Sequence, residues 1–535
     1  MKLLVTDELS KEGLDVLTKG SGLQVDVRPG IPQEELIKII GGYEALIIRS
    51  GTKVTKEVIE AGKKLRVVGR AGVGVDNVDV ETATRKGILV MNTPMGNIVS
   101  AAEHTMAMML TLVRKIVWAD ASLKGGKWER GKFTGTELNG KTLGIVGVGR
   151  VGAEVAKRAK SFQMKMVGYD PFLPPEVAVK LGVRLLPLEK VIEEADVITV
   201  HAPLTPSTKH ILGKEQFKMM KPNVLLVNCA RGGIVDEEAL YEALKNKRIA
   251  GAALDVFEAE PPKGSKLLEL DNIVVTPHLG ASTKEAQEKV SLEMAECVKA
   301  FLVEGKISNA VNAPLGKADS KVMPFIPLAE MLASCAFQLV DGPVKRIETA
   351  FYGELAGLDT KTLTTSAIIG VLSNIIGEEQ VNIINAVSIA KEKGIQVSET
   401  KSEDSPRYVN MVAVRLHSDG IHREVRGTVF PGAQPRLLGI DEYDIDMPIE
   451  GDFLMTKHND VPGIIGRVGT VLGDNHINIA RMGVGRETRG GMAVMLVAVD
   501  DIVSKEVLDY MLKLKDFREA RFIRLSQMRT KAYIV

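Results

Sequence analysis

Residues 142–152 constrain the fold of this chain more than any other stretch, because a short apolar run there leads into three glycines spaced as G-x-G-x-x-G. The run predicts a buried strand, and residues 153–162 have the spacing of a helix. Gly147, Gly149 and Gly152 suit a tight turn, the close approach of a pyrophosphate, and close packing of strand against helix. Backbone N–H groups at the start of such a helix bind phosphate without a charged side chain. The stretch predicts a dinucleotide-binding turn.

A carboxylate further along the chain indicates which dinucleotide binds. Asp170 follows a second predicted strand, residues 164–169. Its carboxylate can accept hydrogen bonds from both ribose hydroxyls of an adenosine, and its charge repels a 2′-phosphate. Residues 171–175 contain no arginine or lysine that could bind such a phosphate. The simpler alternative is an ordinary strand–helix turn beside a surface aspartate, but the combined pattern predicts NAD as the cofactor.

Composition excludes several classes of protein. A chain of 535 residues is long enough for about three or four domains. The net charge of +1 does not suggest a nucleic-acid or membrane partner, and no apolar run approaches the ~18–20 residues of a bilayer span. The cysteines Cys229, Cys297 and Cys335 are few and far apart, which fits a reducing cytoplasm better than a disulfide framework. We expect a cytoplasmic protein without a signal peptide and without a metal site.

Short apolar runs alternate with helical segments over the first half of the chain, which is typical of doubly wound parallel sheets. We expect a flavodoxin-like substrate-binding domain at 1–98, completed by a returning helix at 285–314, and a Rossmann-like NAD-binding domain at 99–284. The expected strands are 2–6, 23–27, 45–49, 65–69 and 88–92 in the first sheet and 143–147, 164–169, 196–200, 224–228, 250–254 and 272–276 in the second.

The connection between these two domains is predicted to be one long helix. Ser100 and Glu103 have the spacing of a capping box, and the helical pattern then continues to about Trp118. His104 lies on this helix, and we interpret it as structural because no acidic residue is spaced to orient it. The loop 72–74 resembles a second nucleotide turn, but Asn77 stands where the third glycine belongs, so we interpret the loop as lining a cleft.

The C-terminal part has a different pattern. Residues 308–321 contain Asn, Pro and Gly and predict a linker. Residues 318–450 begin with a helical pattern and continue with alternating strands such as 408–416 and 424–429, which indicates an α+β intervening domain. Residues 451–535 read as strand, helix, two strands, helix and strand, the βαββαβ order of a ferredoxin-like module.

Polar side chains stand at the ends of three successive strands of the predicted second sheet. Arg231 follows the first, Asp255 and Glu260 the second, and His278 the third. Ligands of open parallel sheets bind outside the carboxyl ends of the strands, so these side chains should converge near the nicotinamide. Individually, Arg231 could be a structural cation and His278 a loop histidine, but their joint occurrence after a dinucleotide turn favours a catalytic site.

Each of these residues suits one task in the transfer of hydride from a secondary alcohol. His278 can take the hydroxyl proton, because an imidazole titrates near neutral pH. Glu260, hydrogen-bonded to His278, would orient the ring and favour its charged form. Arg231 offers a planar fork that matches a carboxylate. Asp255 could accept a hydrogen bond from the nicotinamide carboxamide.

Six longer runs of the chain can be compared with known families: 49–50, 68–72, 128–130, 135–142, 228–236 and 277–286. They resemble the D-isomer-specific 2-hydroxyacid dehydrogenases and, among them, the phosphoglycerate dehydrogenase family. The match is strong over residues 1 to about 310, and the tail is similar to the long form of that family, with an intervening domain and a C-terminal ACT domain.

The resemblance implies oxidation of 3-phospho-D-glycerate to 3-phosphohydroxypyruvate with NAD, the first step of L-serine biosynthesis. It makes Arg231 and Glu260 catalytic and His278 the proton donor and acceptor. It also implies contacts to NAD, through the main chain alone at Val73 and Ala202. Those contacts lie at Val73, Gly147, Gly149, Arg150, Val151, Gly152, Asp170, Ala202, Cys229, Ala230, Arg231, Asp255, His278, Gly280 and Ala281.

The matching segments also suggest how a phosphorylated substrate is held. A dianionic phosphate needs Arg or Lys to replace its hydration. Taken singly, each such arginine could equally be a solvated surface charge. Arg130 could reach the cleft of a neighbouring subunit, which would make the enzyme a homodimer or homotetramer with residues 99–140 at the interface. The candidate substrate residues are Arg49, Ser50, Arg70, Gly72, Asn97 and Arg130.

The terminal module carries a candidate effector site at His458, Asp460 and Asn478. A helix start near Gly463 could attract the carboxylate of an amino acid, while Asp460 and Asn478 bind its amine. Similar ACT domains bind L-serine as a feedback inhibitor, and the alternative is a purely structural dimerisation module. In the intervening domain, an anion-binding patch is conceivable, but a solvated basic face is the simpler reading of its arginines, which are Arg415, Arg423, Arg426 and Arg436.

Two other functions fit parts of this pattern. A hydroxypyruvate or glyoxylate reductase would keep Arg231, Glu260 and His278 but would not need several phosphate-facing arginines. A non-catalytic NAD-sensing protein could use the same fold without turnover, although the intact set of three residues argues against it.

Overall fold

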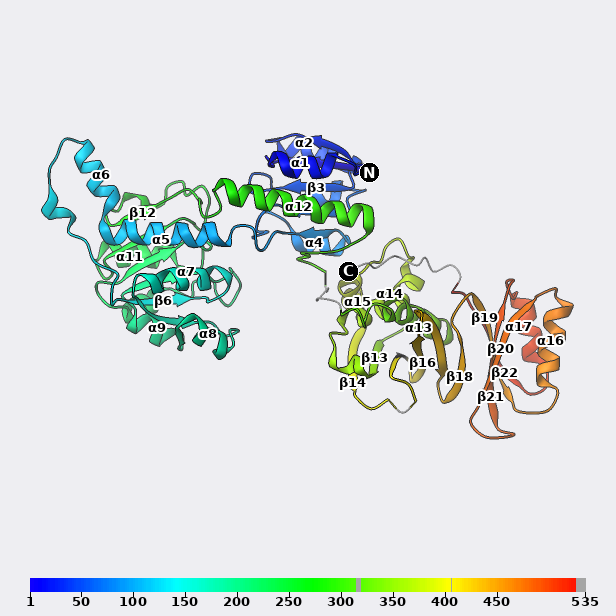
Figure 1. The fold of residues 1–535 in the computed structure, drawn as a ribbon. Helices are drawn as coiled ribbons and strands as arrows, with labels where there is room; N and C mark the ends of the chain where they lie inside the picture. Colours follow the sequence, from blue (N-terminus) through cyan, green and yellow to red (C-terminus); the bar gives the residue numbers. More distant parts are fainter. Residues whose placement is uncertain (314–318, 406, 526–535) are drawn as a thin grey trace.

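The computed structural model describes residues 1–313, 319–405 and 407–525 (Figure 1). Those residues form four sheets, of five, seven, six and four strands in chain order. Two parallel sheets covered by helices make up the first half of the chain, and two sheets that are mainly or wholly antiparallel make up the second. The fold class predicted from the sequence, doubly wound α/β followed by α+β modules, is confirmed.

The first sheet is parallel and has the flavodoxin-like order β2-β1-β3-β4-β5. Its central strand β3 is completely buried, because helices cover both faces of the sheet. The helix α12 returns from the second lobe and packs against α1. The strands are β1 (Lys2–Val5), β2 (Gln24–Val27), β3 (Ala45–Ile48), β4 (Val67–Arg70) and β5 (Leu89–Met91), and the helices are α1 (Lys11–Thr18), α2 (Gln33–Ile39), α3 (Lys56–Ala61), α4 (Val80–Arg85) and α12 (Lys284–Glu304).

The second sheet is also parallel, in the Rossmann-like order β12-β11-β10-β9-β6-β7-β8. All six predicted strands are present, and β8 is an additional strand that the sequence did not predict, since only Val183 among its three residues is buried. The strands are β6 (Thr142–Val146), β7 (Lys165–Tyr169), β8 (Val183–Leu185), β9 (Val197–Val200), β10 (Leu225–Asn228), β11 (Gly251–Leu254) and β12 (Ile273–Val275), and the helices are α7 (Arg150–Ser161), α8 (Pro175–Leu181), α9 (Leu188–Glu194), α10 (Lys214–Met219) and α11 (Glu237–Lys245).

The helix predicted from Ser100 to about Trp118 is two helices, α5 (Ile98–Arg114) and α6 (Ile116–Lys124), separated by Lys115 in a left-handed conformation. The predicted capping box is wrong, because α5 begins before Ser100. The Ser100 hydroxyl donates to the Gly280 carbonyl at 2.9 Å, and Glu103 pairs with Arg158 at 3.0 Å. Both side chains tie α5 to its own lobe. The helix α6 and the loop after it extend away from that lobe (Figure 1).

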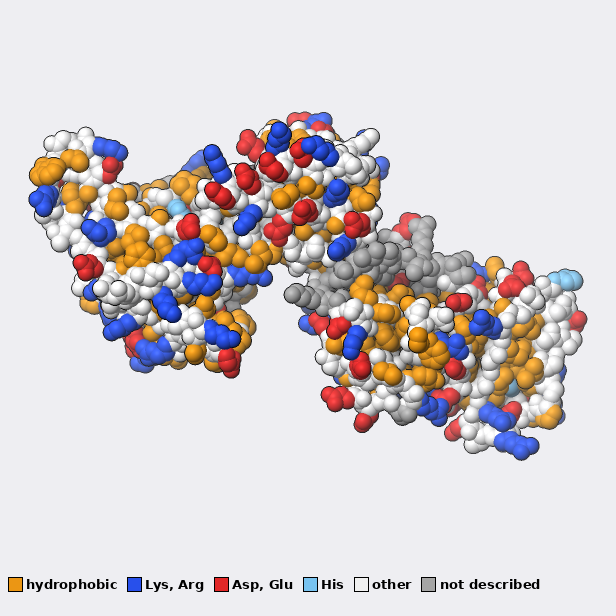
Figure 2. All heavy atoms as spheres, viewed as in Figure 1, with side chains coloured by type: hydrophobic (Ala, Val, Ile, Leu, Met, Phe, Trp, Pro, Cys, Tyr) orange, Lys and Arg blue, Asp and Glu red, His pale blue; other side chains and the backbone are white. Residues whose placement is uncertain are grey.

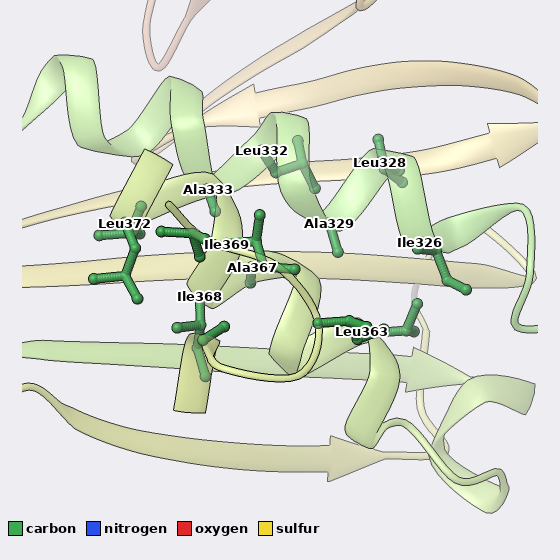
Figure 3. Packing of buried hydrophobic residues seen from close by; sticks show 14 of the residues in the cluster. Ile326, Leu328, Ala329, Leu332, Ala333, Leu363, Ala367, Ile368, Ile369 and Leu372 are labelled. Atoms are coloured by element: carbon green, nitrogen blue, oxygen red, sulfur yellow. The ribbon is translucent and has the colours of Figure 1, made fainter. Parts of the chain in front are cut away.

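The intervening domain has a sheet in the order β14-β13-β15-β16-β17-β18, covered by α13 and α14. These helices pack through Ala329, Ala333 and Ile369 (Figure 3). The sequence predicted the first helix and two of the strands but not β13 or α14. The elements are α13 (Phe325–Leu339), β13 (Arg346–Gly353), α14 (Lys361–Ile376), α15 (Ala386–Glu392), β14 (Gln396–Ser402), β15 (Asn410–Ser418), β16 (Ile421–Phe430), β17 (Gln434–Ile440) and β18 (Tyr443–Pro448).

The terminal module has the predicted βαββαβ order and the ferredoxin-like sheet β20-β21-β19-β22, with antiparallel pairing throughout. Residues 526–535 of the predicted module lie outside the described part of the chain. The elements are β19 (Asp452–Asn459), α16 (Ile464–Asp474), β20 (Ile479–Arg486), β21 (Met492–Val499), α17 (Lys505–Lys513) and β22 (Phe517–Ile523). The described residues also include four 3-10 segments, which are η1 (Ile40–Gly42), η2 (Arg130–Phe133), η3 (Lys266–Glu269) and η4 (Glu354–Gly357).

The C-terminal half is attached to the first lobe. The predicted linker is only partly free of structure, because Ala310 pairs with β5 and Asn312 accepts a hydrogen bond from the Val90 N–H at 2.8 Å. Residues 314–318 of that linker lie outside the described residues. Further along, the Asn382 amide donates to the Gly87 carbonyl at 2.9 Å, which joins the intervening domain to the turn between α4 and β5.

Basic and acidic side chains are interspersed on the face of the molecule that Figure 2 shows. Within the described residues, no helix is both long enough and apolar enough to cross a bilayer.

Candidate active site

The expected pair of His278 and Glu260 is formed. His278 follows β12 and Glu260 follows β11, and the Nδ1 atom of the ring lies 2.7 Å from a carboxylate oxygen of Glu260. Partial burial tends to raise the pKa of Glu260, but the hydrogen bond and the charge interaction with His278 outweigh it, so the pKa is lowered. A charged Glu260 holds the proton on Nδ1 and leaves Nε2 to exchange a proton with a substrate.

Asp255 organises the loop that carries His278. Its side chain is completely buried and accepts hydrogen bonds from the Thr276 hydroxyl at 2.6 Å and the N–H groups of Leu279 and Gly280 at 2.7 and 2.8 Å. Burial would raise the pKa of Asp255, but these donors and His104 together lower it. The His278 N–H donates to the Asp255 carbonyl at 2.9 Å, and the residue has a left-handed φ of 55°. Asp255 therefore fixes the backbone on both sides of His278.

His104 has an acidic partner after all. Its Nε2 atom lies 3.2 Å from Asp255 Oδ1 and 3.2 Å from the Thr276 hydroxyl. The statement that nothing acidic orients His104 is wrong, because the partner comes from a strand end far away in the sequence. The structural role assigned to His104 agrees with this contact, which adds another side chain to the cluster around Asp255.

Arg231 lies on the loop after β10 and reaches the first lobe. Its Nε donates to Asp76 at 3.1 Å, and its Nη1 donates to the Ala230 carbonyl at 2.7 Å. The Asn228 amide donates to the Arg231 carbonyl at 3.0 Å and holds this turn in place. A Cβ atom on Gly232 would overlap the Phe257 carbonyl, so only glycine lets the loop pack against the end of β11.

The glycine turn leaves room for a pyrophosphate. A Cβ atom on Gly152 would overlap the Gly147 carbonyl, and one on Gly147 would lie 2.8 Å from the Ala202 nitrogen. The position of a Cβ atom on Gly149, by contrast, has no atom within 4 Å. The helix α7 begins at Arg150 without a side-chain cap, so its first N–H groups can bind an anion.

Asp170 is held against the same turn. One carboxylate oxygen accepts from the Val148 N–H at 2.9 Å and the other from the Phe172 N–H at 2.9 Å. Each oxygen keeps a further lone pair that can accept from a ribose hydroxyl. Arg150 points across to the first lobe, where its Nη1 is 3.4 Å from the Pro94 carbonyl. Val151, next to Arg150, packs against the core of the second lobe.

The remaining predicted NAD contacts lie around Asp255 or line the cleft. A Cβ atom on Gly280 would come within 3.3 Å of Asp255 and 4.0 Å of the Cys229 carbonyl. Burial, reinforced by the charge of Asp255, raises the pKa of Cys229 to about 12, so its thiol stays neutral. The Ala230 N–H donates to the side chain of Asn228 at 3.1 Å. Ala281 closes the turn after Gly280, and the Val73 carbonyl accepts from the Asn92 amide at 2.6 Å.

Two of the candidate substrate arginines lie at adjacent strand ends in the first lobe. Burial and the charge of Arg231 lower the pKa of Arg70 to about 10, and its Nε finds no hydrogen-bond partner among the described residues. Gly72 makes room for this guanidinium, since a Cβ atom there would overlap Arg70. The Arg49 N–H, next to Ser50, donates to Asp7 at 2.5 Å.

The other two substrate candidates lie on the segment that leaves the first lobe. Asn97 directly precedes α5, and its side chain makes no capping bond. Arg130 opens η2, which follows α6, and its side chain is exposed.

Sequence analysis missed two residues at this cleft, Asp76 and Asn77. Asp76 pairs with Arg231, and the Asn77 amide donates to the carbonyls of Arg49 and Thr52, both at 2.7 Å. For Asn77 the signal was present in the loop after Gly74, where this residue stands in place of the third glycine of the motif, whereas no pattern in the sequence marked Asp76. The Asn77 amide binds the loop 49–52, at the position where a third glycine would allow a phosphate to approach.

The candidate effector residues are not equally accessible. The ring of His458 is 1% exposed and packs on Phe517 with centroids 5.8 Å apart. Asp460 accepts from Arg486 at 3.0 Å and from the Gly490 N–H at 3.1 Å, while the exposed Asn478 donates to Asp500 at 2.6 Å. Asp460 and Asn478 can meet a ligand at the surface, whereas His458 belongs to the core.

The arginines of the intervening domain form neither an anion-binding patch nor a solvated face. Each one pairs with a carboxylate on another strand or in the turn after β17, and Arg426 also pairs with Glu424 of its own strand, so their charges are already neutralised. Arg415 and Arg426 pair with Glu424, Arg423 pairs with Asp441 and Glu519, and Arg436 pairs with Asp446.

The described residues hold no cluster of three or more His, Cys, Asp or Glu side chains arranged for a metal ion.

Family models match three parts of the chain. Residues 106–280 match the NAD-binding domain of D-isomer specific 2-hydroxyacid dehydrogenases, residues 321–441 the intervening domain of D-3-phosphoglycerate dehydrogenase, and residues 453–514 the ACT domain. The fold and the cleft, together with the first match, define an NAD-binding dehydrogenase of the D-2-hydroxyacid class.

Similar proteins of known name identify the family within this class of dehydrogenases. The D-3-phosphoglycerate dehydrogenase of Archaeoglobus fulgidus is 45% identical over 98% of this chain and 100% of its own, and that of Bacillus subtilis is 41% identical over 98% and 99%. The chain belongs to the D-3-phosphoglycerate dehydrogenase family.

Solved structures are similar to the two N-terminal lobes. A protein of Thermus thermophilus is 39% identical with a TM-score of 0.54, over 58% of this chain and 100% of its own. The D-lactate dehydrogenase of Aquifex aeolicus, complexed with NAD and lactic acid, is 30% identical with a TM-score of 0.51, over 59% and 100%.

Replacing Asp255 by Asn tests its organising role. The amide keeps the size of the side chain but removes the charge that the surrounding donors face, so we expect the free energy of unfolding to fall by about 2–4 kcal/mol. Because the folded-state pKa of Asp255 is lowered, its contribution is fully present above about pH 4 and is lost as the pH falls through the folded-state pKa. Denaturant unfolding from about pH 3 to about pH 8 measures this difference.

Asp271→Asn is the matched control, because this exposed aspartate lies in the same lobe just before β12. Its stability should stay within about 0.5 kcal/mol of the parent. An Asp255→Asn effect that grew as the pH fell would contradict the assignment of Asp255 as a stabilising buried carboxylate.

Proposed function

We propose that this chain oxidises the C2 hydroxyl of 3-phospho-D-glycerate to the ketone of 3-phosphohydroxypyruvate with NAD, the first step of L-serine biosynthesis. The observation that carries this proposal is the 2.7 Å contact between His278 and Glu260 at strand ends next to Arg231. Membership of the D-3-phosphoglycerate dehydrogenase family supports the choice of substrate.

His278 takes the alcohol proton on Nε2, while Glu260 holds Nδ1–H and stabilises the positive charge that develops on the ring. Arg231 binds the substrate carboxylate through the part of its guanidinium that Asp76 and Ala230 leave free. Bound NAD supplies the acceptor for the hydride that leaves C2. The first turn of α7 binds its pyrophosphate, and Asp170 accepts from its ribose hydroxyls.

The phosphate of the substrate would lie against the first lobe. Arg70 is a largely buried guanidinium with an unpartnered Nε among the described residues, and Arg49 stands at the end of the adjacent strand. A buried cation with free donors is poorly solvated, and a dianion restores those missing interactions. Ser50, Gly72 and Asn97 border the same region in the sequence and remain proposed contacts.

Selectivity and the role of His278 can be tested together by NADH formation. Without the phosphate contacts, glycerate and lactate should show a kcat/KM at least about 100-fold below that of 3-phosphoglycerate. His278→Ala should lower kcat by about 10²–10⁴-fold. The matched control is His210→Ala, because His210 is a half-exposed histidine of the same lobe with a glutamate partner at 3.1 Å.

Equal NADH production by His278→Ala and the parent would remove the catalytic assignment. Equal rates with glycerate and 3-phosphoglycerate would instead favour a hydroxypyruvate or glyoxylate reductase. Binding of NAD without turnover of any 2-hydroxy acid would point to the NAD-sensing alternative.

We propose further that the working unit is at least a dimer, with residues 99–140 at the interface. The helix α6 buries none of its residues, and Trp128 just beyond it is 77% exposed. Exposed apolar surface on an extended arm is typical of protein–protein contacts. In such a dimer, Arg130 would add a cation to the cleft of the neighbouring copy.

Sedimentation velocity of the parent and of Trp128→Ala tests this interface. We expect the parent to sediment as a dimer or larger, and the dissociation constant of the variant to be about 30-fold higher or more, because a large buried aromatic side chain commonly contributes about 2 kcal/mol or more at an interface. Phe172→Ala is the control, since Phe172 is also highly exposed but lies outside residues 99–140. A monomeric parent, or equal effects of the two variants, would contradict the proposal.

The terminal module is an ACT domain, and we propose L-serine as its effector. The carboxylate would lie at the uncapped start of α16 after Gly463, and the amine would lie against Asp460. Asn478 precedes β20 at the opposite end of the sheet, so it would reach the same ligand only from a second copy of the module. The burial of His458 gives it the role of supporting this site from the core.

Titration of the dehydrogenase rate with L-serine tests the effector. The parent should be inhibited, and Asp460→Ala should raise the half-inhibitory concentration by about tenfold or more, because a charge-assisted hydrogen bond to the amine is lost. Asp474→Ala, an exposed aspartate at the far end of α16, should respond like the parent. Absence of both inhibition and calorimetric binding in the parent would remove serine as the effector.

A further inference from the structure

The loop 72–77 of the first lobe touches both sides of the cleft. It follows β4 and carries Asp76, whose carboxylate accepts from Arg231 Nε at 3.1 Å. Arg231 belongs to the second lobe, so this ion pair joins the two lobes directly beside the site proposed for the substrate carboxylate. Asp76 is not among the groups that the mechanism above uses.

The loop is held rigidly from within the first lobe. The Thr93 N–H donates to the Gly72 carbonyl at 2.9 Å, and the Asn92 amide donates to the Val73 carbonyl at 2.6 Å. The Asn77 amide donates to two carbonyls of the 49–52 loop, both at 2.7 Å. Asp76 therefore projects from a fixed frame that also carries Arg49 and Ser50.

Gly74 makes the ion pair possible. A Cβ atom at this position would overlap Arg231 Nη2 and would lie 2.6 Å from the Asp76 carboxylate. Any other residue at 74 would require the guanidinium and the carboxylate to shift from these positions. The loop has the shape required to receive the side chain of Arg231 on its surface.

The contacts of Arg231 leave a defined set of donors free. A guanidinium has five N–H bonds. Asp76 takes the one on Nε and the Ala230 carbonyl takes one on Nη1, which leaves one on Nη1 and both on Nη2. These two nitrogens form the fork that binds a carboxylate with two parallel hydrogen bonds. Asp76 and Ala230 together fix the rotation of the fork.

Charge favours the same arrangement. Arg70 and Arg231 repel each other, and burial together with the charge of Arg231 lowers the pKa of Arg70 to about 10. The charge of Asp76 acts in the opposite direction on Arg70. A carboxylate beside the two guanidinium groups reduces the cost of holding them in one cleft before an anionic substrate arrives.

We propose that Asp76 is a positioning residue of the dehydrogenase, which fixes the guanidinium of Arg231 across the cleft so that Nη1 and Nη2 face the carboxylate of the 2-hydroxy acid. This inference rests on the proposed function, because it assigns Arg231 to that carboxylate. Asp76 itself touches neither substrate nor cofactor in this role.

The test compares Asp76→Ala and Asp76→Asn with the parent in NADH formation from 3-phosphoglycerate. Asp76→Ala should raise the KM for 3-phosphoglycerate by about three- to tenfold, because the fork loses its orientation. Asp76→Asn keeps the shape and one oxygen acceptor, so its rise should be smaller. The KM for NAD should stay within about twofold of the parent, since the dinucleotide turn lies on the other lobe.

Glu81→Gln is the matched control, because Glu81 is an exposed acid of the same lobe in the first turn of α4. It should match the parent in both KM values. A general loss of negative charge from this lobe would affect Glu81→Gln and Asp76→Asn alike, whereas a positioning role affects Asp76 alone.

A double-mutant cycle with Arg231→Lys shows whether Asp76 acts through Arg231. Lysine has no guanidinium fork to orient, so Asp76→Ala should change the KM of the Arg231→Lys enzyme by less than about twofold. The same three- to tenfold rise in both backgrounds would overturn the proposal. An unchanged or lower KM in Asp76→Ala would overturn it as well, since Asp76 would then be irrelevant or a competitor of the substrate.

Failure of the proposed function gives a different result. A parent chain that forms no NADH from 3-phosphoglycerate contradicts the proposed reaction, and the inference about Asp76 falls with it. An active parent whose Asp76 variants are indistinguishable from it contradicts the inference alone.

Discussion

The buried charge of Asp255 is the interaction on which the geometry of the active site depends. A carboxylate with no exposed surface is stable only among donors, and here those donors are the Thr276 hydroxyl and the N–H groups of Leu279 and Gly280. They belong to the loop that carries His278. The requirement to solvate one charge inside the protein therefore determines where the imidazole stands, and Glu260 then selects which of its nitrogens keeps the proton.

A second constraint comes from side chains that are absent. Gly147 and Gly152 allow strand and helix to approach closely, which leaves the first N–H groups of α7 open to an anion. Gly72 and Gly74 have a different role, because a side chain at either position would occupy the space of a guanidinium, that of Arg70 or of Arg231. One set of glycines prepares a site for the negative charge of a ligand, and the other accommodates positive charge of the protein.

The sequence predicted those parts of the fold that local patterns determine. Apolar strands and the glycine turn indicated both parallel sheets, and strand ends in a parallel sheet must converge, which is why the contact between His278 and Glu260 could be anticipated. Short polar elements such as β8 lack such a pattern. The break at Lys115 was also missed, because helical spacing continues on both sides of it.

The other predictions from the sequence failed because they depended on contacts between segments that are far apart along the chain. His104 meets Asp255 only once α5 packs under the second sheet, and no spacing along the chain encodes that approach. The arginines of the intervening domain read as a basic face because their carboxylate partners lie on other strands. Asp76 gave no signal, since its partner belongs to the opposite lobe. Pairing across folded strands is a tertiary property.

The hydrogen bonds of Asn312 and Asn382 attach the C-terminal half of the chain to the first lobe. The intervening and ACT domains are anchored to the lobe that holds Arg49 and Arg70, so they would travel with that lobe whenever the crevice widens. A force that acts on the ACT domain would therefore turn the first lobe. It would reach the second lobe only through the segments that connect the two lobes. Through such a movement, an effector could change the opening between the lobes without any contact with the dinucleotide.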